Sequence, residues 1–395
     1  MTSEVAVIGG GPAGLLCAIA LATAGVDVVL IAPAARPDQR TTALLAGSAT
    51  ALATLGVWAS CAAHAAPLRK IRIVDDTRRL IRAPEVVFDA AEIDLEAFGH
   101  NVENRYLLAA LEARAAELKL ARIAAPALEV RPDADGVTVI LGDGEARVRL
   151  AIGADGARSL CRKAAGIASS RRTYAQSALT LNLGHARSHD DISTEFHCEG
   201  GPFTLVPLRG RRSSLVCVLA PVEAEKLSAM SESELTGEIE RRAHWLLGRM
   251  CIEQGRGIFP LALESAECLA HRRIALVGEA AHVVPPIGAQ GLNLGLRDAA
   301  AVAEIVADAR RQRQDLGSPG VLARYEAARR ADIFSRTLAV DILNRSLLAD
   351  FLPLQGVRGL SLYLVERIGP LRRALMREGV APAAAQPRLM RGERV

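Results

Sequence analysis

Strand-like and helix-like hydrophobic patterns alternate along the start of the chain. Residues 5–8 and 27–31 are mainly apolar runs, typical of strands buried in a parallel sheet. Residues 12–24 lie between them and predict a helix. This order of strand, helix and strand predicts a Rossmann-like domain. Further helices are expected over residues 48–56, 103–118, 231–247 and 296–309, and over most of the chain after residue 318.

The pattern changes between residues 178 and 219. Short apolar runs recur there with the spacing of an antiparallel sheet, at residues 179–183, 203–208 and 214–219. We therefore predict an α/β fold in which a Rossmann-like domain is interleaved with an antiparallel-sheet domain, plus C-terminal helices. The expected bounds are 1–70, 95–175 and 263–335 for the first domain, 71–94 and 176–262 for the second, and 336–395 for the C-terminal helical segment.

A glycine-rich turn follows the first predicted strand. Gly9, Gly11 and Gly14 have the spacing G-x-G-x-x-G. The first glycine permits a tight turn, the second lets a diphosphate approach the backbone, and the third lets the helix pack on the strand. Pro12 and Ala13 begin that helix, whose free N–H groups favour phosphate. The turn predicts a dinucleotide site, and the alternative is a glycine turn that binds nothing.

The acidic residue that normally ends the second strand of such a site is missing. It holds the ribose hydroxyls, but here Ala32 and Pro33 follow the strand. Arg36 and Arg40 come next. We interpret Arg36 as a solvated loop charge, whereas a cationic side chain at Arg40 can contact phosphate.

A second glycine-rich stretch lies more than two hundred residues later. A predicted strand at 274–277 ends in Gly278 and Glu279, and two prolines precede Gly288 and Gly291. Bare backbone N–H groups at the start of the next helix suit the pyrimidine edge of a flavin, which becomes anionic on reduction. The two stretches together predict an FAD enzyme. Asn293 and Asp298 can alternatively be helix-start features without a cofactor role.

Composition excludes several other classes of protein. The chain of 395 residues suggests about two to three domains. A net charge of +4 and 3% aromatic residues argue against nucleic-acid binding. The 7 cysteines are scattered without a C-x-x-C pair, which argues for free thiols and against a metal site. Without a visible signal peptide or a long apolar helix, a cytoplasmic protein is expected.

Three separated motifs carry a resemblance to a known family. Residues 153–159, Gly-Ala-Asp-Gly-Ala-Arg-Ser, match the family's second motif, and residues 278–293 match its third. With the N-terminal glycine turn, they resemble the class A flavoprotein aromatic hydroxylases, which have the para-hydroxybenzoate hydroxylase fold. Within that class, the chain is most similar to the ubiquinone-biosynthesis 2-polyprenylphenol hydroxylases. The resemblance covers residues 5–310 and implies a Rossmann-like FAD-binding domain of the GR2 type beside a substrate domain.

The resemblance also implies roles for individual residues. Arg40 is expected near the diphosphate, Asn104 near the ribityl chain and Val130 near the adenine. Asp155 is linked to both FAD and NAD(P)H, and Glu279 stands where the family has the aspartate that holds the ribityl chain. Pro286 and Gly288 are expected to line the face where oxygen reacts. The remaining implied cofactor-binding residues are Gly9, Gly11, Pro12, Ala13, Gly14, Gly291, Leu292 and Asn293.

The implied reaction is hydroxylation of the aromatic ring of a polyprenylated phenol in ubiquinone biosynthesis. NADPH or NADH reduces FAD, dioxygen adds, and a flavin hydroperoxide transfers the hydroxyl group. The sequence does not identify a base for the phenol proton. His185, His189 and His197 are interpreted as ordinary histidines of the sheet, and His282 as a structural part of the flavin turn. Hydroxylation of a small soluble aromatic acid, or a non-catalytic FAD- or NAD-binding scaffold, are the alternatives.

The C-terminal segment has a basic amphipathic pattern. Residues 351–395 contain eight arginines and three glutamates, interleaved with leucines. A helix of this kind can lie on an anionic membrane. We therefore expect peripheral contact with the cytoplasmic side of the membrane, close to other ubiquinone-biosynthesis proteins. The alternative is a helix that packs on the FAD-binding domain with a solvated basic face.

Overall fold

The parallel sheet predicted for the first domain is present. The computed structural model describes residues 2–34, 38–77, 82–253, 255–348, 367–380 and 386–395. In this sheet β1 lies between β11 and β2, and both pairings are parallel. The strand order is β18 (Ala270–His271), β19 (Ile274–Leu276), β11 (Gly144–Gly153), β1 (Thr2–Ile8), β2 (Val28–Ile31) and β8 (Ala121–Ile123).

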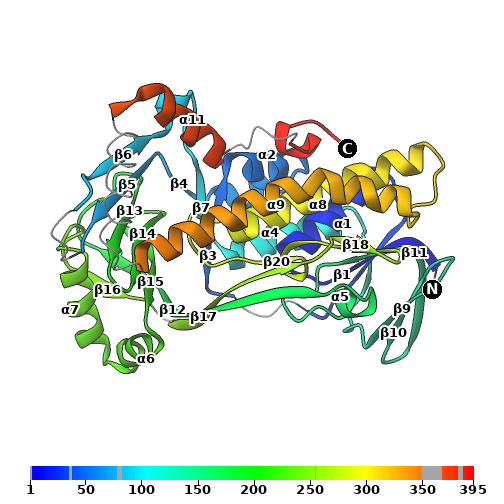
Figure 1. Ribbon diagram of the computed structural model, residues 1–395, viewed down its shortest axis with the longest axis horizontal. Helices are drawn as coiled ribbons and strands as arrows, with labels where there is room; N and C mark the ends of the chain where they lie inside the picture. The colour runs from blue at the N-terminus through cyan, green and yellow to red at the C-terminus, as the bar shows by residue number, and fades with distance from the viewer. Residues whose placement is uncertain (1, 35–37, 78–81, 254, 349–366, 381–385) are drawn as a thin grey trace.

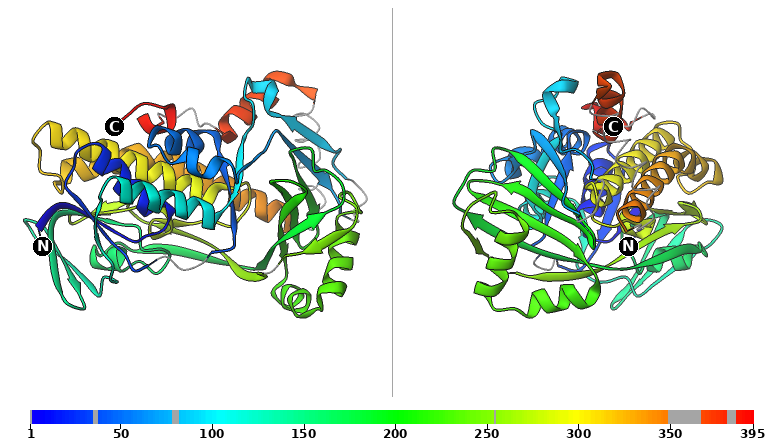
Figure 2. Two further views of the ribbon diagram at one scale, coloured as in Figure 1. Left: turned by 180° about the vertical axis from the view of Figure 1, so that it is seen from behind. Right: turned by 60° about the vertical axis from the view of Figure 1, so that its left-hand side comes forward.

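Helices cover one face of this sheet, as Figures 1 and 2 show. They are α1 (Pro12–Thr23), α4 (Asn104–Glu117) and α8 (Gln290–Arg311), with α9 (Pro319–Leu348) packed on α8. Residues 14–21 of α1 are all buried, because this helix is apolar on every side and lies inside the main core. Strand β10 (Val137–Leu141) extends this sheet antiparallel to β11, and β9 (Glu129–Pro132) pairs with β10. Helix α5 (Leu160–Ala164) packs on β9 and β11.

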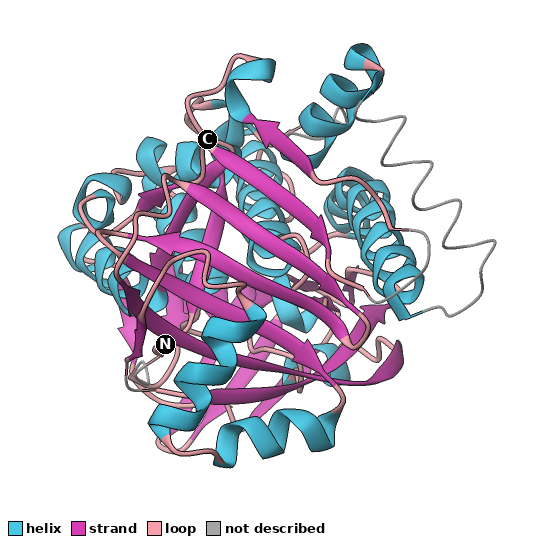
Figure 3. Cartoon of the chain, turned by 90° about the vertical axis from the view of Figure 1, so that its left-hand side faces the viewer, coloured by secondary structure: helices cyan, strands magenta, loops and turns pink. Residues whose placement is uncertain are grey.

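A second, mostly antiparallel sheet forms the other end of the molecule (Figure 3). Its order is β20 (His282–Val283), β17 (Gly257–Ala266), β12 (Ser169–His185), β15 (Arg212–Leu219), β14 (Gly201–Leu208), β13 (Ile192–Cys198), β5 (Lys70–Asp75) and β6 (Val86–Asp89), with β16 (Met250–Ile252) beside β12. Helices α6 (Pro221–Ala229) and α7 (Glu232–Arg242) cover one face, which we call the outer face. Leu181, Leu205 and Leu215 lie there in one apolar cluster with residues of both helices.

The opposite, inner face of this sheet is turned toward the first domain. A small sheet lies between the two parts and consists of β3 (Thr41–Leu45), β7 (Gly99–Glu103) and β4 (Ala66–Pro67). Along the chain, α2 (Ala46–Thr54) and α3 (Trp58–Ala62) lie between β3 and β4, and the short helix η1 (Ala90–Ile93) precedes β7. Asn101 of β7 donates hydrogen bonds to Pro207 O at 2.9 Å and to Ser214 Oγ at 3.2 Å. These bonds fix the inner face against the first domain.

The structure confirms the predicted α/β class and corrects several elements. Helix α8 begins at Gln290, six residues before the expected start, because Ala289 adopts a left-handed conformation (φ 55°) and lets the helix begin inside the glycine loop. The helix expected over 231–247 ends at Arg242, and β3, β7 and β13 were not predicted. Strand β12 runs without interruption through residues 175 and 176, where we placed a boundary, so the domain limits remain a prediction.

The C-terminal part is described only in sections. Residues 351–366 and 381–385 of the predicted basic segment lie outside the described residues. Helix α11 (Gly369–Val380) packs Met376 and Val380 on η1 and Phe98. Within the ranges that the structure describes, every helix is too short or too polar to cross a bilayer.

Candidate functional site

The three sequence motifs meet at one edge of the parallel sheet. In the strand register, Ile8 pairs with Gly153, and Gly153 pairs with Leu276. These are the last residues of β1, β11 and β19, and one motif follows each strand. Ligands of open α/β sheets bind in the crevice beyond the carboxyl ends of the strands. The fold therefore brings together segments that lie up to 270 residues apart in the sequence.

The glycines of the first motif differ in the space around them. A Cβ on Gly9 would lie 2.1 Å from Ala154 O, and one on Gly14 would lie 2.1 Å from Gly9 O. Both glycines are therefore required by close packing inside the protein. A Cβ on Gly11 would meet nothing within 4 Å. The backbone at Gly11, which caps the N-terminus of α1, is open to a ligand with the charge of a diphosphate.

Asp155 of the second motif caps a helix. Its carboxylate accepts hydrogen bonds from Ser159 Oγ at 2.6 Å and from Cys161 N at 3.0 Å, at the N-terminus of α5. The following residue, Gly156, has a positive φ of 80°, and a Cβ there would lie 3.9 Å from Glu279 Oε2. The second and third motifs are thus neighbours. The cofactor role of Asp155 remains a prediction.

Glu279 lies in the short helix η2 (Gly278–Ala280), directly after β19. Its side chain is exposed at the same edge of the sheet as Gly11 and Gly156. Gly278 has a φ of 61°, and a Cβ on Gly295 of α8 would lie 2.9 Å from Gly278 Cα. Because α8 and the turn touch through two glycines, the Glu279 carboxylate is held at the edge where the motifs meet.

A buried group of charges supports this turn from behind. Asp298 Oδ2 accepts hydrogen bonds from Gly278 N at 3.1 Å and from His282 Nε2 at 2.6 Å, and Oδ1 accepts one from Arg329 Nε at 2.8 Å. Burial raises the pKa of Asp298, but its interactions with His282 and with the Arg329 guanidinium outweigh burial and hold the pKa at about 2. His282 is therefore structural, as predicted. Asp298 is not a helix-start feature, since it lies in the third turn of α8.

Arg329 connects this group to a second carboxylate. It donates to Asp332 Oδ2 at 2.7 Å, and Arg297 donates to the same oxygen at 2.8 Å. All three side chains are at least 94% buried. Sequence reasoning missed Arg329 and Asp332, because their spacing in α9 does not differ from that of ordinary exposed helical charges.

The loop before α8 presents both predicted oxygen-side residues. Pro286 and Gly288 are exposed, whereas Ile287 between them is buried and anchors the loop. Gly288 has a φ of 64°, and a Cβ there would meet nothing within 4 Å. Gly291 and Leu292 lie in the first turn of α8, where backbone N–H groups have no partner within the helix. The loop therefore offers exposed backbone beside a helix N-terminus.

Asn293 has a different environment from the one expected of a cofactor ligand. Its amide donates to Ala43 O at 2.8 Å and to Ala289 O at 2.6 Å, and its oxygen accepts from Leu45 N at 2.9 Å and Ser48 Oγ at 2.7 Å. The side chain is fully buried and fully hydrogen-bonded. It joins α8 to β3 and α2. Contact with a cofactor through its backbone remains a prediction.

Arg40 and Asn104 converge on Asp38. Arg40 donates to both oxygens of that carboxylate, at 2.9 and 2.8 Å, and Asn104 Nδ2 donates to Oδ2 at 2.9 Å. Burial raises the pKa of Asp38, but these hydrogen bonds outweigh it and lower the pKa below its usual value. Arg40 is half exposed. Sequence reasoning missed Asp38, which positions both predicted cofactor residues.

Two expectations concern the adenosine end of the cofactor. Val130 lies in β9 with its side chain buried in the main core, so its proximity to adenine remains a prediction. Ala32 is buried, and a Cβ on Gly10 would lie 2.9 Å from its side chain. Arg36 lies outside the described residues.

A row of partly exposed side chains crosses the middle of the inner face. By strand register, its members are neighbours on β12, β15, β14 and β13, and we call them the open row: Thr180, Val216, Thr204 and Glu195. The adjacent row with Asn182 and Ser214 is buried against the first domain, and the row on the other side, with Ala178 and Val218, is also buried. The open row is therefore the accessible part of the inner face.

The open row begins next to Arg40. A Cβ on Gly257 would lie 2.7 Å from the ring of Phe259 and 3.3 Å from Thr180 Oγ1. Arg40 Cζ lies 5.4 Å from the centroid of the same ring. From Thr180 to Glu195 there are three strand spacings of about 4.8 Å, so the row extends roughly 14 Å from this point.

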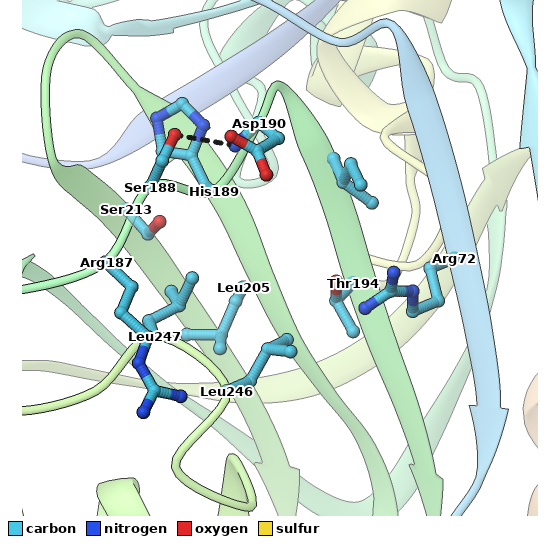
Figure 4. Close-up of a pocket in the computed structure, with 11 residues that line it drawn as sticks. Arg72, Arg187, Ser188, His189, Asp190, Thr194, Leu205, Ser213, Leu246 and Leu247 are labelled. Atoms are coloured by element: carbon cyan, nitrogen blue, oxygen red, sulfur yellow. Dashed lines mark hydrogen bonds between the residues drawn. The ribbon is translucent and has the colours of Figure 1, made fainter.

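A cavity of about 360 Å³ lies elsewhere, on the outer face (Figure 4). Leu205, Leu246 and Leu247 form its apolar part, and Arg72 and Arg187 stand at opposite sides. His189, at its edge, is already hydrogen-bonded to Leu208 O and Asp191 N. The cavity lies on the face that α7 covers, so the second sheet separates it from the edge of the parallel sheet where the three motifs meet.

The fold and the converging motifs define a flavoprotein, and comparison with known proteins gives its family. The chain belongs to the FAD binding domain family, whose model matches residues 2–336. It is 37% identical to the ubiquinone hydroxylase UbiL of Rhodospirillum rubrum, over 99% of this chain and 93% of that protein. It is 33% identical to the 3-demethoxyubiquinol 3-hydroxylase of Escherichia coli, over 95% of this chain and 97% of that protein.

Solved structures agree on the fold. The p-nitrophenol 4-monooxygenase of Pseudomonas putida superposes with a TM-score of 0.78 at 22% identity, covering 95% of this chain and 97% of that chain. The FAD complex of Klebsiella pneumoniae HpxO with uric acid has a TM-score of 0.76 at 21% identity, covering 94% and 97%. The chain is an FAD-dependent monooxygenase, as predicted from the motifs.

Proposed function

We propose that this protein hydroxylates the aromatic ring of a polyprenylated phenol in ubiquinone biosynthesis, with NAD(P)H as reductant and dioxygen as co-substrate. The observation that carries the proposal is the convergence of the three motifs beside the inner face of the second sheet. The similarity to ubiquinone hydroxylases along nearly the whole chain supports the same substrate class.

The residues at the motif edge fit FAD. The open space at Gly11 would take the diphosphate at the N-terminus of α1, and Arg40 would add a cation beside it. The exposed Glu279 carboxylate would accept hydrogen bonds from ribityl hydroxyls. Backbone N–H groups of residues 288–292 would face the pyrimidine edge. When bound, FAD supplies the transfer of electrons from NAD(P)H to oxygen.

The chain's own groups would orient the substrate and shield it from water. The open row offers apolar and hydroxyl surface with a single carboxylate, Glu195, on which a neutral phenol ring can lie. A benzoate-like substrate would bring a second negative charge to Glu195, and like charges in a poorly solvated site repel. This charge favours a phenol over the alternative of a small aromatic acid.

The proposal is tested with purified protein reconstituted with FAD. A 2-prenylphenol with a short side chain, NADH or NADPH, and air should give one hydroxylated product by mass spectrometry, with an oxygen atom from labelled dioxygen. Para-hydroxybenzoate serves as the small acid. Hydroxylation of the acid alone, or consumption of NAD(P)H without stimulation by the phenol, would contradict the assignment.

We further propose peripheral contact with a membrane, where a polyprenylated substrate resides. Three apolar side chains of α9 at four-residue spacing are unusually exposed: Phe334 at 66%, Leu338 at 43% and Ile342 at 57%. Arg330 and Arg345 on the same helix are also exposed. An apolar stripe bordered by arginines is typical of helices that lie on anionic lipid.

Helix α11 supports the same surface. It packs on η1, and Arg372 is ion-paired with Glu92, so part of its basic pattern is internal. Ile368, Leu371 and Leu375 remain exposed. Arg336 of α9 donates to Glu378 Oε1 at 2.9 Å, which joins the C-terminal end of α11 to α9. One side of α11 is therefore packed on η1, and we propose that its exposed apolar side extends the membrane surface of α9.

A further inference from the structure

Glu195 is the carboxylate of the open row, and His197 holds it in place. His197 Nε2 lies 2.8 Å from Glu195 Oε1, and Thr204 Oγ1 donates to Oε2 at 3.3 Å. His197 is buried at 3% exposure, whereas the Glu195 side chain is 17% exposed. One side of the carboxylate is therefore anchored to the sheet, and the other is accessible on the inner face.

The contact with Glu195 orients the imidazole ring of His197. Its Nδ1 is buried and has no hydrogen-bond partner among the described residues. A proton on Nε2 that points to Glu195 is the arrangement that the contact favours. Asp75 pairs with His197 across β13 and β5, but its own carboxylate accepts hydrogen bonds from Thr77 and from Ala83 N. Glu195 is thus the partner of the imidazole.

We propose that Glu195 is the general base that accepts the proton of the substrate phenol, and that His197 is its positioning residue. The inference rests on the proposed function. The phenol O–H bond breaks, the proton forms a new bond to Glu195 Oε2, and the electron pair stays on the phenol oxygen. The resulting phenolate pushes electron density into the ring at the positions that accept oxygen, and the carboxylic acid returns the proton to the product.

The position of Glu195 suits this role for a physical reason. A general base must reach the proton it removes and must be kept in one orientation. The hydrogen bonds from His197 and Thr204 orient the carboxylate, and Val216 keeps the neighbouring surface apolar. In the register of β13 and β5, the ionisable neighbours of Glu195 on the inner face are His197 and Asp75, while Arg40 lies at the far end of the open row.

The test compares FAD-loaded wild type with Glu195→Gln and Glu195→Asp, using a short-chain 2-prenylphenol and NADH or NADPH. Asp190→Asn is the matched control, because Asp190 is an exposed carboxylate of the same domain on the outer face, in a left-handed conformation that asparagine adopts readily. Product, peroxide, FAD occupancy and thermal unfolding are measured from pH 7 to 9.

We expect Glu195→Gln to lower kcat for product by about 100-fold or more at pH 7, with KM, FAD occupancy and unfolding unchanged. NAD(P)H consumption should continue and release peroxide. The ratio of wild-type kcat to Glu195→Gln kcat should fall by about tenfold per pH unit, because the phenol ionises by itself as the pH approaches its own pKa near 10. Glu195→Asp should be intermediate, and Asp190→Asn should match wild type.

Two results separate this inference from the function it rests on. If wild type forms no hydroxylated phenol, the proposed function fails, and the inference fails with it. If wild type is active and Glu195→Gln keeps more than half of its kcat, or loses activity equally at every pH, Glu195 is not the base. Should Glu195→Gln fail to fold, wild-type kcat in Glu195→Asp would overturn the proposal.

Discussion

The side chain of Asp298 accepts a hydrogen bond from the backbone N–H of Gly278 at 3.1 Å. A carboxylate in the third turn of α8 thereby fixes the turn that presents Glu279. His282 and Arg329 also bind the Asp298 carboxylate, so four elements, η2, β20, α8 and α9, share one buried group. The geometry of the predicted flavin turn therefore depends on buried residues that lie behind it.

Replacing Asp298 should lower the free energy of unfolding of the protein and loosen this turn. Asp298→Asn breaks the buried ion pair with Arg329, which retains only Asp332, a carboxylate that it shares with Arg297, and breaking such a pair typically costs about 3–5 kcal/mol. We expect a loss of that size in urea unfolding of the apoprotein. Glu238→Gln, which removes a carboxylate from partly exposed ion pairs in α7, should cost less than about 1 kcal/mol. Equal stability of the two variants would contradict the structural role of Asp298.

The same residue makes a predictable contribution to acid stability. Its pKa of about 2 in the folded protein lies below the usual value of 3.8. Folding therefore gains from its ionisation above about pH 4, and this gain is lost as the pH falls toward 2; a shift of this size corresponds to roughly 2 kcal/mol. The difference in unfolding free energy between wild type and Asp298→Asn should narrow by that amount from pH 5 to 2. A constant difference would show that Asp298 titrates normally.

Gly11→Val should abolish FAD binding without destabilising the apoprotein. The φ of Gly11, −73°, suits any residue, and its Cβ position is free of protein atoms. Gly14→Ala should instead destabilise the apoprotein, because its Cβ would lie 2.1 Å from Gly9 O. Flavin absorbance after reconstitution and thermal unfolding distinguish the two effects. Full flavin occupancy in Gly11→Val would refute the placement of the diphosphate.

Glu279→Ala should weaken FAD binding while leaving the apoprotein intact, since the Glu279 side chain is exposed. Loss of hydrogen bonds to a charged group costs about 1.5–3 kcal/mol, which corresponds to a roughly 10- to 100-fold higher Kd. Glu279→Asp keeps the charge and should bind more tightly than Glu279→Ala. Quenching of FAD fluorescence on titration measures both values. Wild-type affinity in Glu279→Ala would mean that the ribityl chain lies elsewhere.

The proposed membrane contact of α9 can be tested by placing negative charges on its exposed apolar side chains. Phe334→Glu combined with Ile342→Glu should abolish co-sedimentation with vesicles of phosphatidylglycerol and phosphatidylethanolamine. Val222→Glu is the control, because Val222 is equally apolar and 76% exposed but lies on α6, over the outer face. Neutral phosphatidylcholine vesicles should bind wild type less well. If all variants sediment alike, α9 is not the contact surface.

The sequence by itself predicted the fold class and the two glycine-rich cofactor segments, because each depends on local chemistry, whereas residues 153–159 were predicted from the resemblance to a known family. Gly9 and Gly14 are required wherever a strand, a tight turn and a helix meet, and the apolar runs at β1, β2 and β19 identify strands that are buried on both faces. The amphipathic sheet pattern likewise predicted β12, β14 and β15. Signals of this kind need only a few neighbouring residues.

Only the tertiary structure decided which polar residues act together. Asp298 with Gly278, Arg40 with Asp38, and Glu195 with His197 and Thr204 are joined by hydrogen bonds that depend on strand register and helix packing. Asn293 matched the cofactor motif in sequence, yet its side chain is fully hydrogen-bonded to other groups inside the protein. A linear pattern does not show whether a polar side chain faces the core, a neighbouring segment or a ligand, because that choice is made when distant elements pack.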